Sequence, residues 1–359
     1  MRRRPQVRDQ VALMSGYHSP QVDVEVRLNT NESPDAPPAE FLEQFAAAAS
    51  LVEWNRYPDR GAEELRAAIA RHHEVGAAQV FAANGSNEVL QTLMVAYGGH
   101  GRSASMFEPT YALHSHISRL TGTRVESGTR ASDFGLDSAE VERVFALEPD
   151  VVFLCSPNNP TGVVERSSTV EELLGRVESW GGILVVDEAY GQFWNDSALR
   201  LVANDRNLVV TRTYSKTWAM AGARLGYLVG PDWLVVELDK VVLPYHLDHL
   251  TQLAGTLALD HVDAMAQRVE RLVAERNRVT ARLGDLAVTV WPSGANFILF
   301  RPEGVGGEEV WQALVDRSVL VRNCASWPGL EGCLRVTIGT PEENTRFLAE
   351  LERAVGTAG

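Results

Sequence analysis

Short apolar runs that do not alternate with polar residues most constrain the fold of this 359-residue chain. Strands buried on both faces carry such runs, whereas strands with one solvated face alternate apolar and polar residues. Runs of this kind, each bounded by turn residues, occur at 151–154, 183–186, 208–210 and 225–229. Apolar residues recur at helical spacing at 40–51, 61–73, 86–97, 137–146 and 168–179. Strands that alternate with helices predict an α/β fold with a mostly parallel sheet.

The pattern changes after Pro231. The remaining chain predicts a long helix at about 248–283, strands at 286–291, 296–300 and 333–338, and helices at 307–317 and from 341. This order is typical of a smaller α+β unit, with the long helix joining the two parts. The length also favours two domains. We therefore predict an N-terminal arm at 1–30, a large domain at 31–250 and a small domain at 251–359.

Charge and composition exclude several classes of protein. The formal net charge of −14 argues against a nucleic-acid or membrane-surface binder, because both need a basic face. The sequence contains no apolar stretch of about eighteen residues, so we expect no transmembrane helix. The basic N-terminus is not followed by the apolar region of a secretory signal, so we expect a cytoplasmic protein. Three cysteines without CxxC spacing and nine histidines without HExxH spacing predict neither disulfides nor a metal site.

The 33 basic residues are unevenly divided, because only Lys216 and Lys240 are lysine. Coding bias explains arginine wherever only a charge is needed. A lysine amine, however, can lose its proton and form a Schiff base, which a guanidinium cannot do. Lys216 follows a predicted strand, with Thr213 and Ser215 before it and Arg224 eight residues after it. These side chains could hold a phosphate while the amine performs chemistry. Lys240 has no motif beside it and is interpreted as a surface charge.

Three further motifs stand at strand ends or helix starts, where an open α/β sheet binds its ligand. The segment ANGSNE at 83–88 could present N–H groups to a phosphate or could be an ordinary capped helix. The segment SPNNPTG at 156–162 fixes a rigid turn that could aim an asparagine into a site. Asp187 ends a buried strand, where it needs a cationic partner unless it caps a neighbouring helix.

The order of these motifs carries a family resemblance. The chain contains SPNNPTG at 156–162, DEAY at 187–190 and SK at 215–216, with an arginine eight residues later. In this order the motifs resemble those of the class I/II (fold type I) pyridoxal-phosphate aminotransferases. The resemblance spans nearly the whole chain. It implies a large cofactor-binding domain with a mostly parallel seven-stranded sheet flanked by helices, and a smaller α+β domain. It also implies pyridoxal 5′-phosphate as cofactor, and an N-terminal arm that joins the small domain and a homodimer interface.

The resemblance assigns roles to individual residues. In that family a lysine carries the cofactor as a Schiff base and an aspartate pairs with the pyridinium nitrogen, which implies Lys216 and Asp187 here. Freed Lys216 would then move the substrate proton. Tyr190, at the 3′ oxygen of the ring, is the third catalytic candidate. Shared active sites are implied by Tyr57, which would reach the cofactor phosphate from a second subunit. The other cofactor-binding candidates are Gly85, Ser86, Asn87, Tyr111, Asn159, Thr213, Ser215 and Arg224.

A narrower resemblance reaches beyond these motifs. Similarity to the histidinol-phosphate aminotransferases, most closely those of actinobacterial type, is carried by LNTNESP at 28–34, RYPD at 56–59, PTY at 109–111, LPYHL at 243–247 and LRVTIG at 334–339. That family transfers an amino group between L-histidinol phosphate and 2-oxoglutarate in histidine biosynthesis. The resemblance implies two anion-binding arginines, Arg322 and Arg335. Tyr17, Asn31 and Tyr245 are the other substrate-binding candidates.

One segment departs from the family pattern. Between Arg322 and Arg335, the loop NCASWPGLEGCL is a few residues longer than in the family and contains Trp327. An aromatic amino-acid aminotransferase, or another paralogue on this scaffold, would have a more apolar pocket and stays open as an alternative. A threonine-phosphate decarboxylase and a non-catalytic pyridoxal-phosphate-binding regulator are further alternatives. A nicotinamide-dependent oxidoreductase is disfavoured, because no G-x-G-x-x-G follows a strand.

Overall fold

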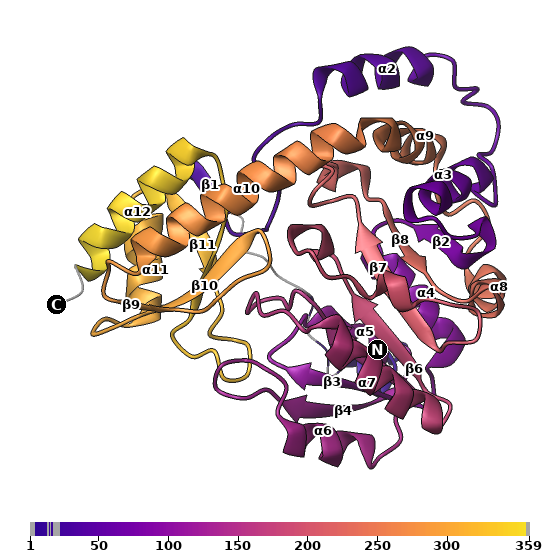
Figure 1. Ribbon diagram of the computed structural model, residues 1–359, viewed down its shortest axis with the longest axis horizontal. Helices are drawn as coiled ribbons and strands as arrows, with labels where there is room; N and C mark the ends of the chain where they lie inside the picture. The colour runs from indigo at the N-terminus through magenta and orange to yellow at the C-terminus, as the bar shows by residue number, and fades with distance from the viewer. Residues whose placement is uncertain (1–3, 13, 15, 17–21, 357–359) are drawn as a thin grey trace.

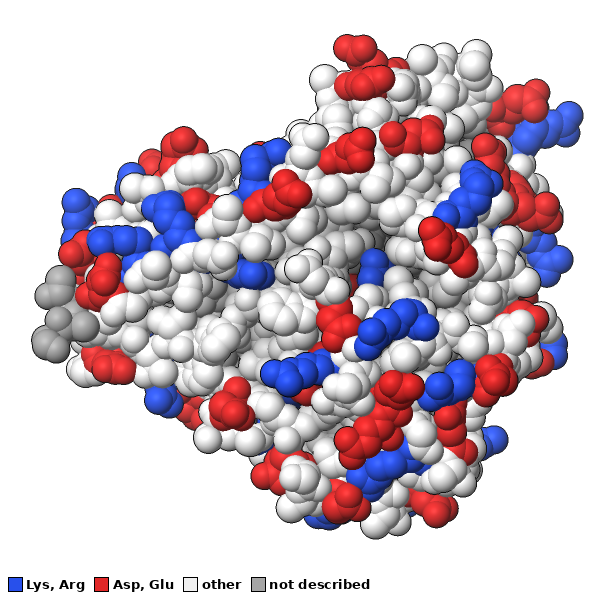
Figure 2. All heavy atoms as spheres, viewed as in Figure 1, with Lys and Arg blue, Asp and Glu red and all other residues white. Residues whose placement is uncertain are grey.

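The computed structural model describes residues 4–12, 14, 16 and 22–356. These residues form a seven-stranded and a five-stranded β-sheet, each covered by helices (Figure 1). No helix in this part of the chain is both long and apolar enough to span a bilayer. On the face seen in Figure 2, acidic and basic side chains are interspersed rather than gathered into a continuous basic patch.

The seven-stranded sheet has the strand order β2-β8-β7-β6-β5-β3-β4. Its strands are β2 (Val80–Ala83), β3 (Ser103–Glu108), β4 (Arg124–Thr129), β5 (Val151–Cys155), β6 (Ile183–Asp187), β7 (Leu208–Thr213) and β8 (Gly226–Val229). Adjacent strands from β7 to β4 run parallel, and β8 runs antiparallel to both of its neighbours. The prediction of a mostly parallel seven-stranded sheet is therefore confirmed.

Helices cover both faces of this sheet. The helices of this part of the chain are α1 (Asp9–Ala12), α2 (Ala39–Ala49), α3 (Glu63–His73), α4 (Ser86–Tyr97), α5 (Leu113–Leu120), α6 (Ser138–Phe145), α7 (Ser167–Ser179), α8 (Asp232–Val241) and α9 (His249–Ala258). In β6, Val185 packs in a core cluster with residues of α4 and α8, whereas the next residue, Val186, packs in another with residues of α6 and α7. Both faces of the strand are buried, which explains its continuous apolar run.

Three strands and one helix of this sheet layer were not predicted from the periodicity. The strands β3 (SASMFE) and β4 (RVESGT) contain serines and charged residues, so neither forms an apolar run. β4 is an edge strand and β2 contains only four residues. The helix α5 (LHSHISRL) is short, and only three of its eight residues are apolar, so its apolar pattern is weak. Short or polar elements of this kind are ordered by the neighbours on which they pack, not by their own pattern.

The five-stranded sheet has the order β1-β11-β12-β10-β9. Its strands are β1 (Val26–Leu28), β9 (Val288–Val290), β10 (Phe297–Pro302), β11 (Val319–Asn323) and β12 (Leu334–Thr337). β1 pairs in parallel with β11, so a segment from near the N-terminus completes a sheet made otherwise of C-terminal strands. The other pairs are antiparallel. The helices that cover this sheet are α10 (Val262–Leu283), α11 (Gly307–Val315) and α12 (Pro341–Val355).

The helical stretch expected at 248–283 is divided in two. A 3₁₀ turn at Leu259–His261 separates α9 from α10. The buried face of α9 packs beside α2 and α3, whereas Leu272 and Val279 of α10 pack in the core of the five-stranded sheet. Figure 1 shows α10, in orange, running from α9 toward the second sheet.

Candidate active site

A cavity of about 410 Å³ lies at the carboxyl ends of β5, β6 and β7. Cys155, Asp187 and Thr213, the last residues of these strands, line it. Open α/β sheets bind their ligands at this edge. The five-stranded sheet contributes Arg322 of β11 and Arg335 of β12 to the same cavity. The site is therefore built from both sheets.

Most of the residues singled out from the sequence come together here. Those that line the cavity are Asn31, Ser86, Asn87, Tyr111, Asn159, Asp187, Tyr190, Thr213, Ser215, Lys216, Arg224, Arg322 and Arg335. Gly85 adjoins it as the residue before α4. Tyr57 and Tyr245 lie outside this cavity, and Tyr17 lies outside the described residues.

Lys216 lies in the cavity and is partly buried. Its Nζ donates a hydrogen bond to the carbonyl oxygen of Thr30 at 3.1 Å. Burial and the positive charge of Arg335 lower the pKa of Lys216 to about 8, against the opposing charge of Glu32. Near pH 8 a large fraction of this amine is uncharged, which a nucleophile or a proton acceptor requires.

Asp187 is buried at the end of β6 and is partnered by a histidine. The Nε2 N–H of His114, on α5, donates to Asp187 Oδ2 at 3.0 Å, and the backbone N–H of Ala189 donates to Oδ1 at 3.0 Å. The imidazole stacks on Phe153, with 4.8 Å between ring centroids. A carboxylate at this depth is costly without partners. Asp187 also lines the cavity, where its carboxylate can pair with a cationic group of a ligand.

The start of α4 and Arg224 approach each other closely at one end of the cavity. A Cβ on Gly85, whose φ is +79°, would lie 2.7 Å from Arg224 Nη2, and a Cβ on Gly226 would lie 2.2 Å from the backbone nitrogen of Ser86. Glycine is therefore required at both positions. Arg224 itself has a φ of +51°, a conformation that costs about 1–3 kcal/mol in a non-glycine residue.

Two hydroxyl groups complete this end of the cavity. Thr213 Oγ1 donates to Ser215 Oγ at 3.0 Å, and Arg224 Nη1 approaches the same hydroxyl at 3.5 Å. A helix N-terminus, a guanidinium and hydroxyl groups are the donors that bind phosphate in proteins. This group of residues can therefore hold a phosphate.

Two tyrosines are fixed around the cavity by asparagines. Asn31 Nδ2 donates to the Tyr190 hydroxyl at 2.9 Å, while Thr337 of β12 donates to Asn31 Oδ1 at 3.0 Å. Burial raises the pKa of Tyr190 to about 12, so this side chain stays a hydroxyl donor at neutral pH. The Tyr111 hydroxyl donates to Asn87 Oδ1 at 3.0 Å. Both rings are thus held in place before any ligand binds.

The SPNNPTG turn directs its two asparagines to different places. Asn158 is buried, accepts a hydrogen bond from Thr110 Oγ1 at 2.8 Å and donates to Thr161 Oγ1 at 2.8 Å. Asn159 lines the cavity and accepts a hydrogen bond from Arg335 Nη1. The first amide therefore anchors the turn and the second faces the site.

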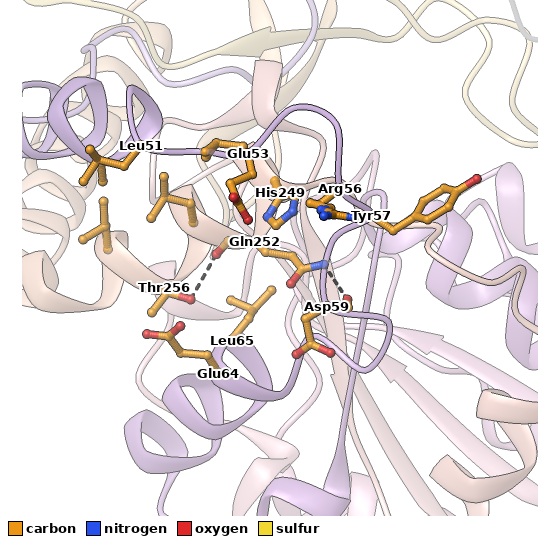
Figure 3. A pocket seen from close by; sticks show the side chains of 14 residues that line it. Leu51, Glu53, Arg56, Tyr57, Asp59, Glu64, Leu65, His249, Gln252 and Thr256 are labelled. Atoms are coloured by element: carbon orange, nitrogen blue, oxygen red, sulfur yellow. Dashed lines mark hydrogen bonds between the residues drawn. The ribbon is translucent and has the colours of Figure 1, made fainter.

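A larger cavity, of about 520 Å³, lies apart from this chemistry. Leu51, Tyr57, His249 and other residues of α2, α3, α9 and their loops line it (Figure 3). Tyr57 is 77% exposed, extends away from the other labelled side chains in Figure 3, and stacks on Tyr245 with 4.5 Å between centroids. Because neither Lys216 nor any of the anion-binding arginines lines this cavity, the reaction is assigned to the smaller one.

Comparison with known proteins places the chain in a family. The family model for aminotransferase class I and II matches residues 23–351. The chain belongs to the class I and II aminotransferase family. It is 45% identical over 362 aligned positions to the histidinol-phosphate aminotransferase of Frankia casuarinae. The alignment covers 97% of this chain and 90% of that protein. It is 42% identical to the histidinol-phosphate aminotransferase of Mycolicibacterium smegmatis, over 98% of this chain and 94% of that one.

Solved structures share the fold of this aminotransferase. The histidinol-phosphate aminotransferase of Sinorhizobium meliloti, in complex with pyridoxal 5′-phosphate, matches with a TM-score of 0.87 at 21% identity, covering 98% of this chain and 97% of that one. The resemblances inferred from the sequence are confirmed, as are the fold class and the assignment as an enzyme.

The cavity of this aminotransferase fits pyridoxal 5′-phosphate, on which the family depends. The close approach of Arg224 to Gly85 forms a cradle that a single Cβ would fill, with donors suited to the phosphate. Buried Asp187 offers a carboxylate to a protonated ring nitrogen. The amine of Lys216, with its lowered pKa, offers the nucleophile that the cofactor aldehyde needs.

Among the residues that the sequence analysis did not single out are Glu32, which lines the cavity, and His114, which lies behind Asp187 and outside the cavity lining. His114 lies on α5, an element that was not predicted, so the partner of Asp187 was missed with it. Glu32 lines the cavity directly beside Asn31, within the LNTNESP segment. An acidic residue inside that motif was the signal that could have identified it.

Proposed function

We propose that this aminotransferase transfers the amino group of L-histidinol phosphate to 2-oxoglutarate, giving imidazole acetol phosphate and glutamate. The observation that carries the proposal is the position of Arg322 and Arg335, which lie directly opposite each other in the register of β11 and β12 and both line the cavity. Two guanidinium groups together suit a phosphate ester and a dicarboxylate alternately. The names of the relatives at 42–45% identity support the same substrate.

The site geometry supports the following cofactor-binding roles. When bound, the pyridoxal ring serves as the sink for the electron pair that develops at the substrate Cα. Asp187, held by His114, keeps the ring nitrogen protonated. We assign the phosphate to Gly85, Ser86, Thr213, Ser215 and Arg224, and the ring and its 3′ oxygen to Asn87, Tyr111, Asn159 and Tyr190.

Lys216 is the proton carrier of the proposed reaction. Its amine, with a pKa lowered to about 8, accepts a proton from the Cα of the donor and later returns a proton to the Cα of the glutamate product. No other lysine side chain lines the cavity, since Lys240 is exposed and pairs with Glu237 on α8.

The two arginines divide the substrate contacts in this proposal. Arg335 is buried and fixed, because its Nη2 donates to the carbonyl oxygen of Asn29 at 2.9 Å and its Nη1 donates to Asn159. Arg322 is less buried. We assign the carboxylates of glutamate and 2-oxoglutarate mainly to Arg335, and the phosphate of histidinol phosphate mainly to Arg322. Tyr17, Tyr245 and Asn87 remain candidates for the imidazole end of the site, and Asn31 remains a substrate-binding candidate.

The proposed active unit is a homodimer. Tyr57 and Tyr245 are stacked on each other and exposed, at 77% and 43%, and do not reach the cavity of their own subunit. Exposed aromatic pairs of this kind mark interaction sites. We propose that Tyr57 contacts the cofactor phosphate of the other subunit. In this proposal each subunit has an N-terminal arm at 1–30, a large domain at 31–250 and a small domain at 251–359. The acidic chain and its biosynthetic role suit the cytoplasm.

An aromatic amino-acid aminotransferase is the second candidate function. Trp327 and Tyr111 both line the cavity, which would favour an aromatic side chain on the amino donor. That enzyme would not need Arg322 for a phosphate.

Two assays separate these functions. One measures glutamate formation from 2-oxoglutarate with L-histidinol phosphate or phenylalanine as donor, and the other measures carbon dioxide release from threonine phosphate. We expect L-histidinol phosphate to give a kcat/KM at least about tenfold above that of phenylalanine, and threonine phosphate to release no carbon dioxide. A preference for phenylalanine would replace the proposed function by the second candidate, and decarboxylation of threonine phosphate would replace both.

The arginine assignment has its own test. Arg322→Ala should raise the KM for histidinol phosphate about a hundredfold, since it removes charge-assisted hydrogen bonds worth about 1.5–3 kcal/mol each, while the KM for glutamate rises less than about tenfold. Steady-state kinetics of both half-reactions measures the two values. Equal losses for the two substrates would contradict the division between the arginines.

A further inference from the structure

The long loop between β11 and β12 places an indole ring against one of the two anion-binding arginines. The Cζ atom of Arg322 lies 5.2 Å from the centroid of the Trp327 ring, over its face. Both side chains line the active-site cavity. A guanidinium over an indole face is attracted to the ring by about 0.5–2 kcal/mol, more where water is excluded. Trp327 is only 9% exposed, so water has little access to its side of this contact.

Trp327 is itself fixed to the large domain. Its Nε1 donates to the carbonyl oxygen of Thr110 at 3.0 Å. Thr110 is held in turn, because its backbone N–H donates to Glu108 at 3.0 Å and its hydroxyl donates to Asn158 at 2.8 Å. The indole therefore connects the β11–β12 loop to the PTY and SPNNPTG turns, which carry cavity residues of the other sheet.

The loop around Trp327 is packed on both sides. Within it, backbone hydrogen bonds connect Cys324 with Cys333 and Trp327 with Leu330. These residues form an apolar cluster with Phe134 and with Leu299 of β10. A ring held by a hydrogen bond and by a packed cluster cannot swing freely. The face that it presents to Arg322 is therefore a fixed platform.

The second arginine shows the same arrangement by other means. Arg335 lies with its Cζ 5.0 Å from the centroid of Phe297, and buried hydrogen bonds to Asn29 and Asn159 hold its guanidinium. A free arginine side chain has about 2 kcal/mol of rotamer entropy to lose when it binds an anion. Fixing the guanidinium beforehand removes part of this cost from binding.

We propose that Trp327 is a positioning residue that orients Arg322 for the phosphate of the substrate. This inference rests on the proposed function, in which Arg322 binds that phosphate. The loop between β11 and β12 brings the indole within hydrogen-bond distance of the Thr110 carbonyl oxygen, beside the cavity residue Tyr111. Trp327 acts through Arg322 and does not itself take part in the proton transfer.

Substitutions at Trp327 that keep or remove the ring test this role. Trp327→Leu and Trp327→Met remove the ring, and each should raise the KM for histidinol phosphate about tenfold with kcat changed less than about threefold. Trp327→Phe keeps a ring face without the N–H, and should stay within about threefold of the unchanged protein in KM. In an Arg322→Ala background, Trp327→Leu should add less than about twofold. The absorbance of bound cofactor confirms that each variant holds it.

A second readout does not depend on turnover. The dissociation constant of inorganic phosphate for the holoenzyme, measured by calorimetry, should rise about tenfold in Trp327→Leu and not in Trp327→Phe. If the unchanged protein does not use histidinol phosphate but this difference is found, the proposed function fails and the positioning role stands. If histidinol phosphate is used but neither its KM nor phosphate binding changes in Trp327→Leu, the positioning role fails alone.

Three other results would overturn the positioning role. Losses that add fully in the double variant would mean that Trp327 acts independently of Arg322. A fall in kcat with unchanged KM would mean that the ring only supports the fold of the site. Failure of both ring-deleted variants to fold, with Trp327→Phe folded, would assign the ring to packing.

Discussion

Lys216 and Lys240 separate two uses of a positive charge in this chain. Arginine serves at the other 31 basic positions, so residue type alone says little about Arg224, Arg322 or Arg335, and their assignment depends on where the fold places them. Lys216 is different because it lines the cavity, whereas Lys240 is exposed beside Glu237. In the proposed reaction, only Lys216 has to lose its proton.

Replacing each lysine by arginine should therefore have opposite outcomes. Lys216→Arg should lower kcat at least about a thousandfold, because a guanidinium neither bonds the cofactor aldehyde nor accepts the Cα proton. Lys240→Arg, which keeps a cation near Glu237, should leave kcat and KM unchanged. Steady-state glutamate formation measures both variants. Substantial activity in Lys216→Arg would disprove the assignment of the amine.

The lowered pKa of Lys216 predicts how cofactor uptake depends on pH. The neutral amine is the reactive form, and its fraction rises with pH through the pKa of about 8. The rate at which cofactor-free protein takes up pyridoxal 5′-phosphate should therefore rise between pH 7 and 8 and level off above about pH 9. Glu32→Gln should move this midpoint to lower pH, because Glu32 raises the pKa of Lys216. A rate that keeps rising to pH 10.5 would indicate an ordinary lysine.

At the scale of the elements, the sequence pattern predicted what burial on both faces imposes. β5, β6, β7 and β8 appear where continuous apolar runs stand, and motifs at their ends lie around one cavity. α5 could not be predicted in the same way, because its polar sequence LHSHISRL gains order from packing on α4 and the sheet. The partner of Asp187, His114, was missed with it.

The pairing of Arg322 with Arg335 was also beyond the sequence. Both were singled out by resemblance, but only the hairpin register of β11 and β12 places them directly opposite each other. Register is set by packing on neighbouring strands and by the connecting loop, and that loop is long and irregular. The contact of Trp327 with Thr110 depends on the same tertiary arrangement.

A buried ion pair between β7 and the residue that follows β6 should contribute strongly to the free energy of unfolding. Arg212 of β7 and Glu188 are both buried, with 2.7 Å between Arg212 Nη2 and Glu188 Oε2. Arg212→Leu leaves Glu188 buried without its partner and should lower the free energy of unfolding by about 3–5 kcal/mol. Lys240→Leu, at an exposed pair, should cost less than about 1 kcal/mol. Urea unfolding compares them, and equal midpoints would contradict the role of burial.

Across the whole molecule, exposed apolar side chains mark the surface that we propose as the contact between subunits. Leu51, Trp54, Tyr57 and Leu243 are between 75% and 81% exposed, and the Tyr57–Tyr245 stack joins the two chain segments that carry them. Large exposed apolar side chains that gather in this way favour an interface.

Charged substitutions on this surface should separate the proposed dimer. Trp54→Glu combined with Leu243→Glu should give a monomer in sedimentation equilibrium and a loss of activity, because Tyr57 no longer reaches the other subunit. Leu147→Glu, at an apolar residue 44% exposed elsewhere, is the matched control and should stay dimeric. If the unchanged protein sediments as a monomer with full activity, the shared active site is wrong.

In the proposed function, Arg322 and Arg335 together select an amino donor that carries a phosphate. The most direct measurement compares L-histidinol phosphate with L-histidinol, which lacks only that group, as donors to 2-oxoglutarate. Charge-assisted hydrogen bonds worth about 1.5–3 kcal/mol each predict a kcat/KM at least about a hundredfold higher for the phosphate ester. Equal values for the two donors, or no glutamate from either, would contradict the proposed function.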